Sequence, residues 1–207
     1  MKIKLIPRFS FTLHLWMYFR FLFSNSLNKV TLFKNRGKIY FTNYARASLY
    51  LLLKSISSKQ LIVGVQAFTC HSVFKAIKKY GHKSIFIDLD NNFKLDIKDL
   101  KKKINKIDVL IITHTFGYPE NINEIKKISK DIIIIEDCSH SFLSKINNKY
   151  TGTFGDASIF SLGLAKFPSI GFGGFALINN IKKFPNFISI YSNLPFPNLF
   201  NALSCTI

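Results

Sequence analysis

The stretch from Asp131 to Gly174 reads DIIIIEDCSHSFLSKINNKYTGTFGDASIFSLGLAKFPSIGFGG, and the interpretation of the whole chain starts from it. It opens with four consecutive isoleucines, which predict a short buried strand. That strand ends in Glu136 and Asp137. Because open α/β sheets bind ligands beyond the carboxyl ends of their strands, we expect this acidic pair to lie at a binding site.

A second strand-like run, Ala157 to Ser161, is followed by Lys166 and then by a glycine-rich turn at 171–174. A carboxylate at one strand end and a lysine after another are the two groups that pyridoxal phosphate requires. Its ring nitrogen must stay protonated, which suits Asp137, and a lysine must hold its aldehyde covalently. Each residue alone is more readily explained as a turn cap or a solvated lysine, so the pair needs further context.

Ordered motifs supply that context. In sequence they are Glu136-Asp137-Cys138-Ser139-His140, Gly152-Thr153-Phe154-Gly155-Asp156, Phe160-Ser161 and Lys166. This order resembles the sugar-nucleotide aminotransferases of the DegT type, and the resemblance extends from about Tyr40 to Asn179. It implies an α/β fold, the large domain of the aspartate aminotransferase-like, pyridoxal phosphate-dependent transferases. We therefore expect a mixed, mostly parallel sheet that is covered by helices on both faces.

The resemblance also implies roles for single residues. Lys166 would hold the cofactor and move protons, and Asp137 would keep the ring nitrogen charged. His140 would lie beside the phenolic oxygen, and Ser161 would bind the phosphate. A solvated lysine, a core histidine and a buried serine are the alternatives for three of these positions.

The apolar spacing of Ala45 to Ile56 predicts a helix, whose first turn can bind an anion through free N–H groups. In the family this turn binds the cofactor phosphate and reads Ser-Gly-Thr. Here Ala45 and Arg46 occupy it, and a guanidinium can also bind phosphate. A surface arginine is the alternative.

The loop at 67–73 resembles the segment that covers the cofactor ring in the family. Cys70 stands where many members have an aromatic residue, and a cysteine cannot provide a stacking face. Phe68 or His71 could replace it, or all three could fill the core. His114 matches a strand-end motif, and we expect it to support the site rather than to catalyse.

Elsewhere, strands and helices alternate, which favours a sheet covered on both faces. We expect strands at 38–42, 61–66, 84–88 and 108–113, a turn at 117–119, and helices at 71–80, 96–104 and 121–130. Asp96 is a predicted N-cap, and Asn121 with Glu124 resembles a capping box.

Composition limits the function classes. The net charge of +18 arises from 29 Lys and Arg against 11 Asp and Glu, but these lysines are scattered along the chain. The dense run from Lys98 to Lys106 is explained by a solvated helix face, so nucleic-acid binding is the weaker alternative. Three cysteines without paired or metal-like spacing favour a reducing cytoplasm and no metal.

The expected domain organisation has three parts. Residues 1–37 form an N-terminal arm, 38–183 a cofactor-binding large domain, and 184–207 a short tail without the family's second, smaller domain. The aromatic run from Phe9 to Phe23 is interrupted by His14 and Arg20, so it is too short and too polar for a membrane span. An arm packed on the domain or on a second subunit is expected, with peripheral membrane attachment as the alternative.

Lys166 also favours transamination, because related sugar dehydratases carry histidine at this position. By resemblance, the substrates are a nucleotide-linked keto-sugar and an amino-acid donor such as glutamate. The product would enter amino-sugar or surface polysaccharide biosynthesis, and a homodimer is expected. A truncated, catalytically silent remnant or interaction protein is the main alternative.

Overall fold

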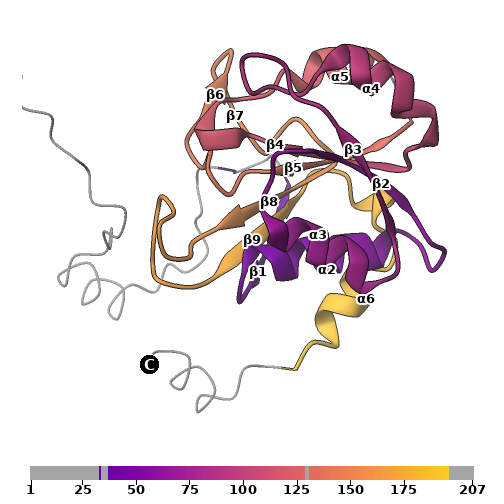
Figure 1. Ribbon diagram of the computed structural model, residues 1–207. Coiled ribbons are helices and arrows are strands. Elements are labelled where there is room, and N and C mark those ends of the chain that lie inside the picture. The colour runs from indigo at the N-terminus through magenta and orange to yellow at the C-terminus, as the bar shows by residue number, and fades with distance from the viewer. Residues whose placement is uncertain (1–32, 34–36, 129–130, 196–207) are drawn as a thin grey trace, which may run out of the picture.

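The computed structural model describes residue 33, residues 37–128 and residues 131–195 of the chain. Within these residues, seven strands form one sheet and a short hairpin forms a second (Figure 1). The strands of the large sheet are β1 Lys38–Thr42, β2 Ile62–Gln66, β3 Lys83–Ile87, β4 Val109–Thr113, β5 Ile133–Asp137, β8 Ala157–Ser161 and β9 Gly174–Ile178. The hairpin consists of β6 Lys145–Ile146 and β7 Lys149–Tyr150.

The strands follow the order β1-β9-β8-β5-β4-β2-β3. Five neighbouring strands, from β8 to β3, are parallel, whereas β9 is antiparallel to both β8 and β1. The predicted mixed, mostly parallel sheet is therefore confirmed. Parallel neighbours need long crossover connections, and helices between the strands provide them.

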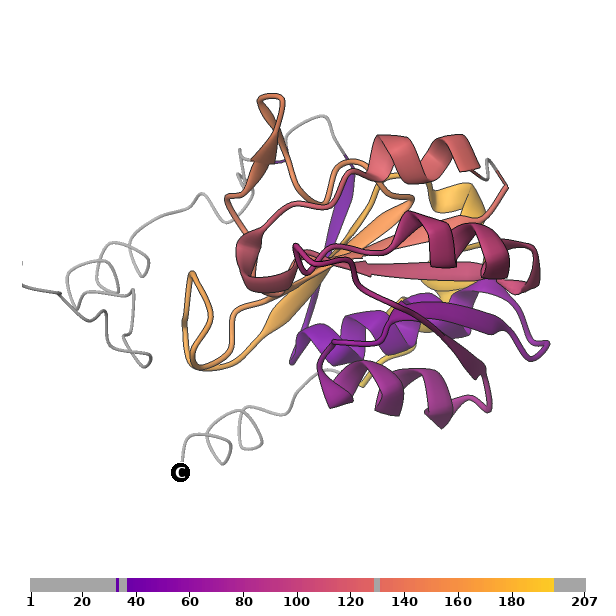
Figure 2. The same ribbon diagram turned by 45° about the horizontal axis from the view of Figure 1, so that its top comes forward.

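Helices cover both faces of the sheet (Figures 1 and 2). They are α2 Ala45–Ile56, α3 His71–Lys79, α4 Ile97–Lys103, α5 Ile122–Ile128 and α6 Phe187–Ser192. The helices α2, α3 and α6 lie on one face, and α4 and α5 lie on the other. Each face has its own cluster of buried aliphatic side chains, which joins the helices to the sheet.

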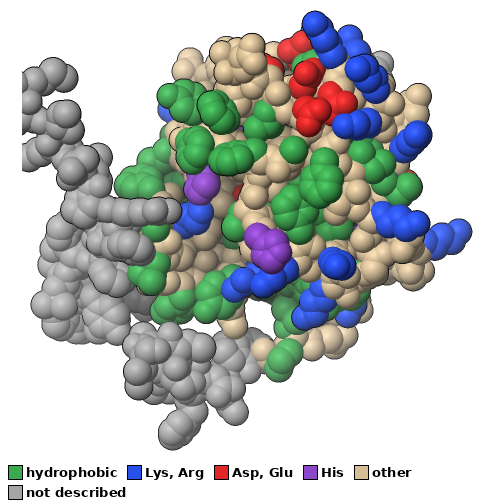
Figure 3. All heavy atoms as spheres, in the orientation of Figure 1, with side chains coloured by type: hydrophobic (Ala, Val, Ile, Leu, Met, Phe, Trp, Pro, Cys, Tyr) green, Lys and Arg blue, Asp and Glu red, His purple; other side chains and the backbone are tan. Residues whose placement is uncertain are grey.

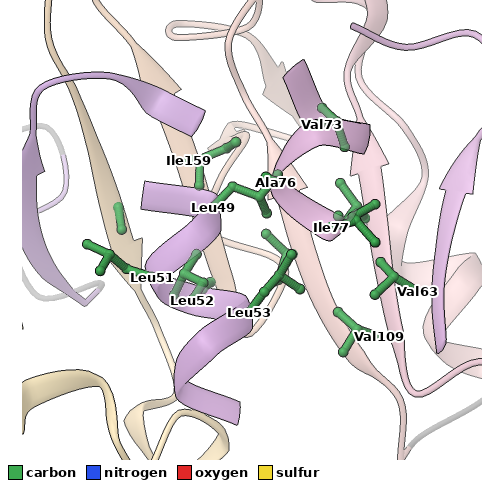
Figure 4. Close-up of a cluster of buried hydrophobic side chains, with 14 of the residues drawn as sticks. Leu49, Leu51, Leu52, Leu53, Val63, Val73, Ala76, Ile77, Val109 and Ile159 are labelled. Carbon is green, nitrogen blue, oxygen red and sulfur yellow. The ribbon is translucent and has the colours of Figure 1, made fainter. Parts of the chain in front are cut away.

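Helix α2 is the most deeply buried helix of the first face. Leu49, Leu52 and Leu53 are fully buried, as their spacing predicts, and Figure 4 shows them among side chains of α3 and the sheet. Leu51 is buried as well, and α6 packs against α2. Because α2 packs against α6 as well as against the sheet and α3, its apolar surface is wider than the single stripe of a helix that is buried on one side.

Most predicted boundaries lie within one or two residues of those observed, and α2, β1 and β8 match throughout. Asp96 caps α4 by accepting the N–H groups of Lys98 and Asp99. Half of the predicted capping box forms. The side-chain oxygen of Asn121 accepts the backbone N–H of Glu124, as in a capping box, but the Glu124 carboxylate accepts from the side-chain NH₂ of Asn121 and not from its backbone N–H. The last two residues predicted for α5, 129–130, lie outside the described residues.

The core extends on both sides of the predicted domain of 38–183. Phe33 is buried against the rings of Phe160 and Phe175, so this residue of the arm packs on the domain. Phe184 and Phe187 are fully buried in the cluster that contains α2. The rest of the predicted arm lies outside the described residues. Among the described residues, no helix has the length and apolarity to span a membrane.

Candidate functional site

A cavity of about 490 Å³ opens at the carboxyl ends of the central strands. Its walls come from the first turn of α2 and from the segments after β2, β4, β5 and β8. The six residues predicted for the site all line it: Ala45, Arg46, Asp137, His140, Ser161 and Lys166. Figure 3 shows histidine and basic side chains together on this face, with hydrophobic side chains around them. Segments as far apart in sequence as Ala45 and Lys166 thus meet at one place.

The acidic pair at the end of β5 divides between two environments, because neighbouring residues of a strand point to opposite faces. Asp137 is buried at the cavity and accepts the N–H of Ser139 at 3.0 Å. Glu136 points to the other side, and its Oε1 accepts the N–H groups of Phe154 and Gly155. Only Asp137 is therefore available to a ligand in the cavity.

The amine of Lys166 lies beside the imidazole of His140, with 2.7 Å between Nζ and Nε2. Burial, and next the charge of Lys166, lower the pKa of His140, while Asp137 acts in the opposite direction. A neutral imidazole accepts a hydrogen bond at Nε2 from the lysine amine and carries its own proton on Nδ1. This pair joins the turn after β5 to the loop after β8.

The first turn of α2 forms another wall of the cavity. No side chain caps this helix at Tyr44, so its first N–H groups lack a side-chain acceptor. Gly174 makes the close approach of β9 possible, because a Cβ there would lie 2.4 Å from the nitrogen of Ala45. Arg46 lies over the ring of Tyr44, and Ser161 lines the cavity from the end of β8. Free N–H groups, a guanidinium and a hydroxyl together can bind an anion.

The loop after β2 contributes Phe68, Thr69 and Cys70 to the cavity wall, whereas His71 is not part of it. Thr69 shares a hydrogen bond of 3.0 Å between hydroxyl groups with Thr113 at the end of β4. Thr113 and Phe116 also line the cavity, but they were not among the residues predicted for the site. Thr113 ends β4 and Phe116 follows it, so the carboxyl-end rule could have indicated both.

A buried cluster beneath the cavity has residue types that metals prefer, namely His114, Glu136 and Cys138. Both carboxylate oxygens of Glu136 are already occupied, since Oε2 also accepts the His114 Nε2–H at 3.0 Å and the Gly152 N–H at 2.7 Å. Burial, and next Glu136, raise the pKa of the Cys138 thiol, which disfavours the thiolate that a metal needs. The geometry supports a structural anchor, and His114 holds it from beneath the site.

Comparisons with known proteins agree with this geometry. The model of the DegT/DnrJ/EryC1/StrS aminotransferase family matches residues 34–186. GDP-perosamine synthase of Escherichia coli O157:H7 is 35% identical over 136 residues, which cover 64% of this chain and 37% of that enzyme. GDP-4-keto-6-deoxy-D-mannose 3-dehydratase of Escherichia coli O55:H7 is 34% identical over 119 residues, 56% of this chain and 31% of the enzyme.

Among solved structures, GDP-4-keto-6-deoxymannose-3-dehydratase with a trapped PLP-glutamate geminal diamine superposes with a TM-score of 0.78. It is 22% identical, and the match covers 93% of this chain and 57% of that one. The sugar aminotransferase CalS13 from Micromonospora echinospora gives 0.74 at 19% identity, over 88% of this chain and 56% of that one. These likenesses confirm the predicted fold. The chain spans about a third of the length of the curated relatives that it matches.

Proposed function

Because the chain belongs to the DegT/DnrJ/EryC1/StrS aminotransferase family, we propose that it provides the cofactor-binding domain of a pyridoxal phosphate-dependent aminotransferase. The reaction moves an amino group from an amino acid, glutamate, to a nucleotide-linked keto-sugar. The observation that carries this proposal is the Lys166 amine at 2.7 Å from His140, in the same cavity as the buried Asp137.

The groups around the cavity fit this cofactor. Asp137 offers a buried carboxylate for a protonated ring nitrogen, and Lys166 offers a primary amine for an aldehyde. The first turn of α2, with Arg46 and Ser161, offers the donors that a phosphate needs. When bound, pyridoxal phosphate supplies an electron sink for the carbon atom that carries the reacting nitrogen.

The residues of the chain then bind, orient and move protons. The carboxylate of Asp137 stabilises the proton on the ring nitrogen, because it is an opposite charge in a buried place. Lys166 must lose a proton to solvent before its amine can attack an aldehyde, and neutral His140 accepts a hydrogen bond from that amine at Nε2 and so orients it. Lys166 can afterwards return a proton to the reacting carbon.

Substrate and assembly are proposed from the relatives and from the surface. The two curated relatives named above carry GDP-linked sugars in their names, which supports a nucleotide sugar that serves amino-sugar or surface polysaccharide synthesis.

Leu164, Phe167 and Phe172 are exposed on the loop that carries Lys166, and this apolar surface supports a homodimer whose subunits contact each other near the cavity. We place the reaction in the cytoplasm, where unpaired Cys70 and Cys138 stay reduced.

Covalent attachment of the cofactor is the first test. Purified protein with added pyridoxal phosphate should show a visible absorption band that borohydride fixes to the chain, and peptide mass spectrometry should find the label on Lys166. Lys166→Ala should abolish the label, whereas Lys182→Ala, at an exposed lysine outside the cavity, should leave it unchanged. Labelling that survives in Lys166→Ala would overturn the proposed attachment site.

Amino transfer is the second test. Wild-type protein that holds pyridoxal phosphate without borohydride treatment, mixed with glutamate and a GDP-linked 4-keto-sugar, should yield 2-oxoglutarate and an amino-sugar nucleotide. Attachment of the cofactor without any transfer would favour the catalytically silent protein. Salt-sensitive nucleic-acid binding without attachment would favour the basic binding protein instead.

A further inference from the structure

Three phenylalanines stand at the mouth of the cavity with their rings largely exposed. Phe68, Phe93 and Phe116 are 51%, 59% and 65% exposed. They come from the loops after β2, β3 and β4, three neighbouring strands of the sheet. Ring centroids are 6.2 Å apart for Phe68 and Phe93, and 6.1 Å apart for Phe68 and Phe116. We call these three rings the aromatic rim.

The backbone holds two of these rings in a conformation that costs free energy. Phe93 has φ 58° and Phe116 has φ 53°, in the left-handed region that bulky residues rarely adopt. Such strain persists where the surrounding structure fixes it, and it gathers at functional sites. An exposed phenylalanine gains little from burial, so packing in the folded chain does not explain why the strain is kept.

A buried polar network fixes the three loops from beneath. Glu120 Oε1 accepts the amide of Gln66, two residues before Phe68, and the N–H of Leu95, two residues after Phe93, both at 2.9 Å. The N–H of Glu120 donates to Nδ1 of His114, two residues before Phe116, at 3.0 Å. One buried residue therefore ties together all three segments that carry the aromatic rim.

The turn that carries Phe93 has a further restraint. The carboxylate of Asp90 accepts the N–H groups of Asn92 and Lys94, on either side of Phe93, at 2.8 and 2.9 Å. The aromatic rim is thus a preorganised surface, and preorganised aromatic rings are what stacking on a planar ligand requires.

The aromatic rim is continuous with the cavity, and this continuity relates it to the ligand proposed above. Phe68 and Phe116 line both the cavity and its mouth, whereas Phe93 lies only on the outer side. A nucleotide sugar whose sugar end reaches Lys166 must leave its base toward this mouth. We propose that the aromatic rim stacks on the base of the nucleotide, with Phe93 as its outermost ring. This inference rests on the proposed function for the identity of the ligand.

Phe93→Ala is the decisive variant, because Phe93 is outside the cavity wall and its loss leaves the cofactor site intact. Calorimetric titration with GDP should show binding weakened about five- to tenfold, since a base–aromatic stack contributes that much or more. Phe93→Trp should restore binding. Titration with pyrophosphate, which has no base, should give the same affinity for the wild type and both variants.

Two controls separate stacking from indirect effects. Phe86→Ala removes a ring that is 50% exposed on β3 outside the aromatic rim, and it should leave GDP binding unchanged. Glu120→Ala should weaken GDP binding by loosening the three loops, whereas Glu120→Gln keeps an oxygen for both donors and should bind GDP nearly as the wild type does.

The inference is overturned if the wild type binds no GDP, or if Phe93→Ala leaves GDP binding unchanged. The inference is likewise overturned if Phe93→Ala lowers the mass measured by sedimentation without changing GDP binding. That result would show that the aromatic rim is a contact between subunits. Covalent labelling of Lys166 by pyridoxal phosphate tests the proposed function separately. If GDP binding depends on Phe93 but Lys166 is not labelled, the proposed aminotransferase function is refuted, whereas the proposed binding of the base by the aromatic rim is supported.

Discussion

At the scale of single residues, Glu136 and Asp137 show how two adjacent carboxylates take different tasks. Glu136 accepts four N–H groups, from His114 and from the turn at 152–155, and is fully buried. Asp137 accepts one backbone N–H and faces the cavity. The first residue positions the turn that precedes β8, and the second is left for chemistry.

Glu136→Gln should therefore destabilise the fold by about 2–3 kcal/mol, because the new NH₂ group meets N–H donors that have no other acceptor. Asp137→Asn is the matched control and should cost less than about 1 kcal/mol, while abolishing the function of the cavity. Urea unfolding followed by circular dichroism measures both. Equal losses of stability for the two variants would contradict this division of tasks.

His82 gives stability a dependence on pH. Its Nδ1 accepts the N–H of Leu61 at 3.2 Å, and burial lowers its pKa from 6.5, although the backbone of Leu53 opposes the shift. The unfolded chain therefore binds a proton more readily than the folded one. The contribution of His82 is present above pH 6.5 and is lost as the pH falls from there toward the folded-state pKa.

The free energy of unfolding should thus fall between pH 7 and pH 5 more steeply in the wild type than in His82→Asn, whose side-chain oxygen can still accept from Leu61. Urea titrations at pH 7, 6 and 5 measure the slope. His71→Asn, at an exposed histidine, should keep the slope of the wild type. An unchanged slope in His82→Asn would refute the assignment.

Among the helices and strands, those whose apolar spacing matches their burial could be predicted from the sequence. Helix α2 was predicted residue by residue, because its leucines follow a helical period. Strand β9 was missed, since its short apolar run after two glycines has no alternation. Helix α6 was missed because its sequence FISIYS is rich in β-branched and aromatic residues, and its stability comes from packing on α2.

The same contrast holds for the candidate site. Ordered motifs together with the carboxyl-end rule indicated the six predicted residues, all of which line the cavity. The aromatic rim could not be predicted in this way, because it depends on positive φ angles at two phenylalanines. Loop conformations of that kind are set by tertiary hydrogen bonds such as those of Glu120, which local sequence does not encode.

The junction between β9 and α2 carries its own prediction. A Cβ at Gly174 would lie 2.4 Å from the nitrogen of Ala45 and 2.7 Å from the carbonyl oxygen of Phe160, and both are backbone atoms. Gly174→Ala should therefore move the first turn of α2 and weaken pyridoxal phosphate binding at least tenfold, measured by fluorescence titration. Gly81→Ala, where a Cβ has open space but φ is positive, should lower stability by about 1 kcal/mol without affecting the cofactor. Equal cofactor affinity in both variants would contradict the role of this junction.

At the scale of the whole molecule, the two faces of the sheet have different relations to the site. The cluster with α2, α3 and α6 reaches the cavity through the first turn of α2, where the phosphate is proposed to bind. The cluster with α4 and α5 lies on the opposite face. Packing near the described C-terminal end should therefore affect cofactor binding, although α6 itself does not line the cavity.

Phe187→Ala tests this connection. Phe187 is fully buried against Tyr40 and Tyr191 in the cluster that contains α2, so its truncation should cost about 3–5 kcal/mol of stability. Ile188→Ala, at the neighbouring exposed position of α6, should stay within about 0.5 kcal/mol of the wild type. If residues 184–195 were a separate tail, urea unfolding would give the two variants the same midpoint. A lower midpoint for Phe187→Ala, accompanied by weaker pyridoxal phosphate binding, would show that α6 belongs to the domain that forms the site.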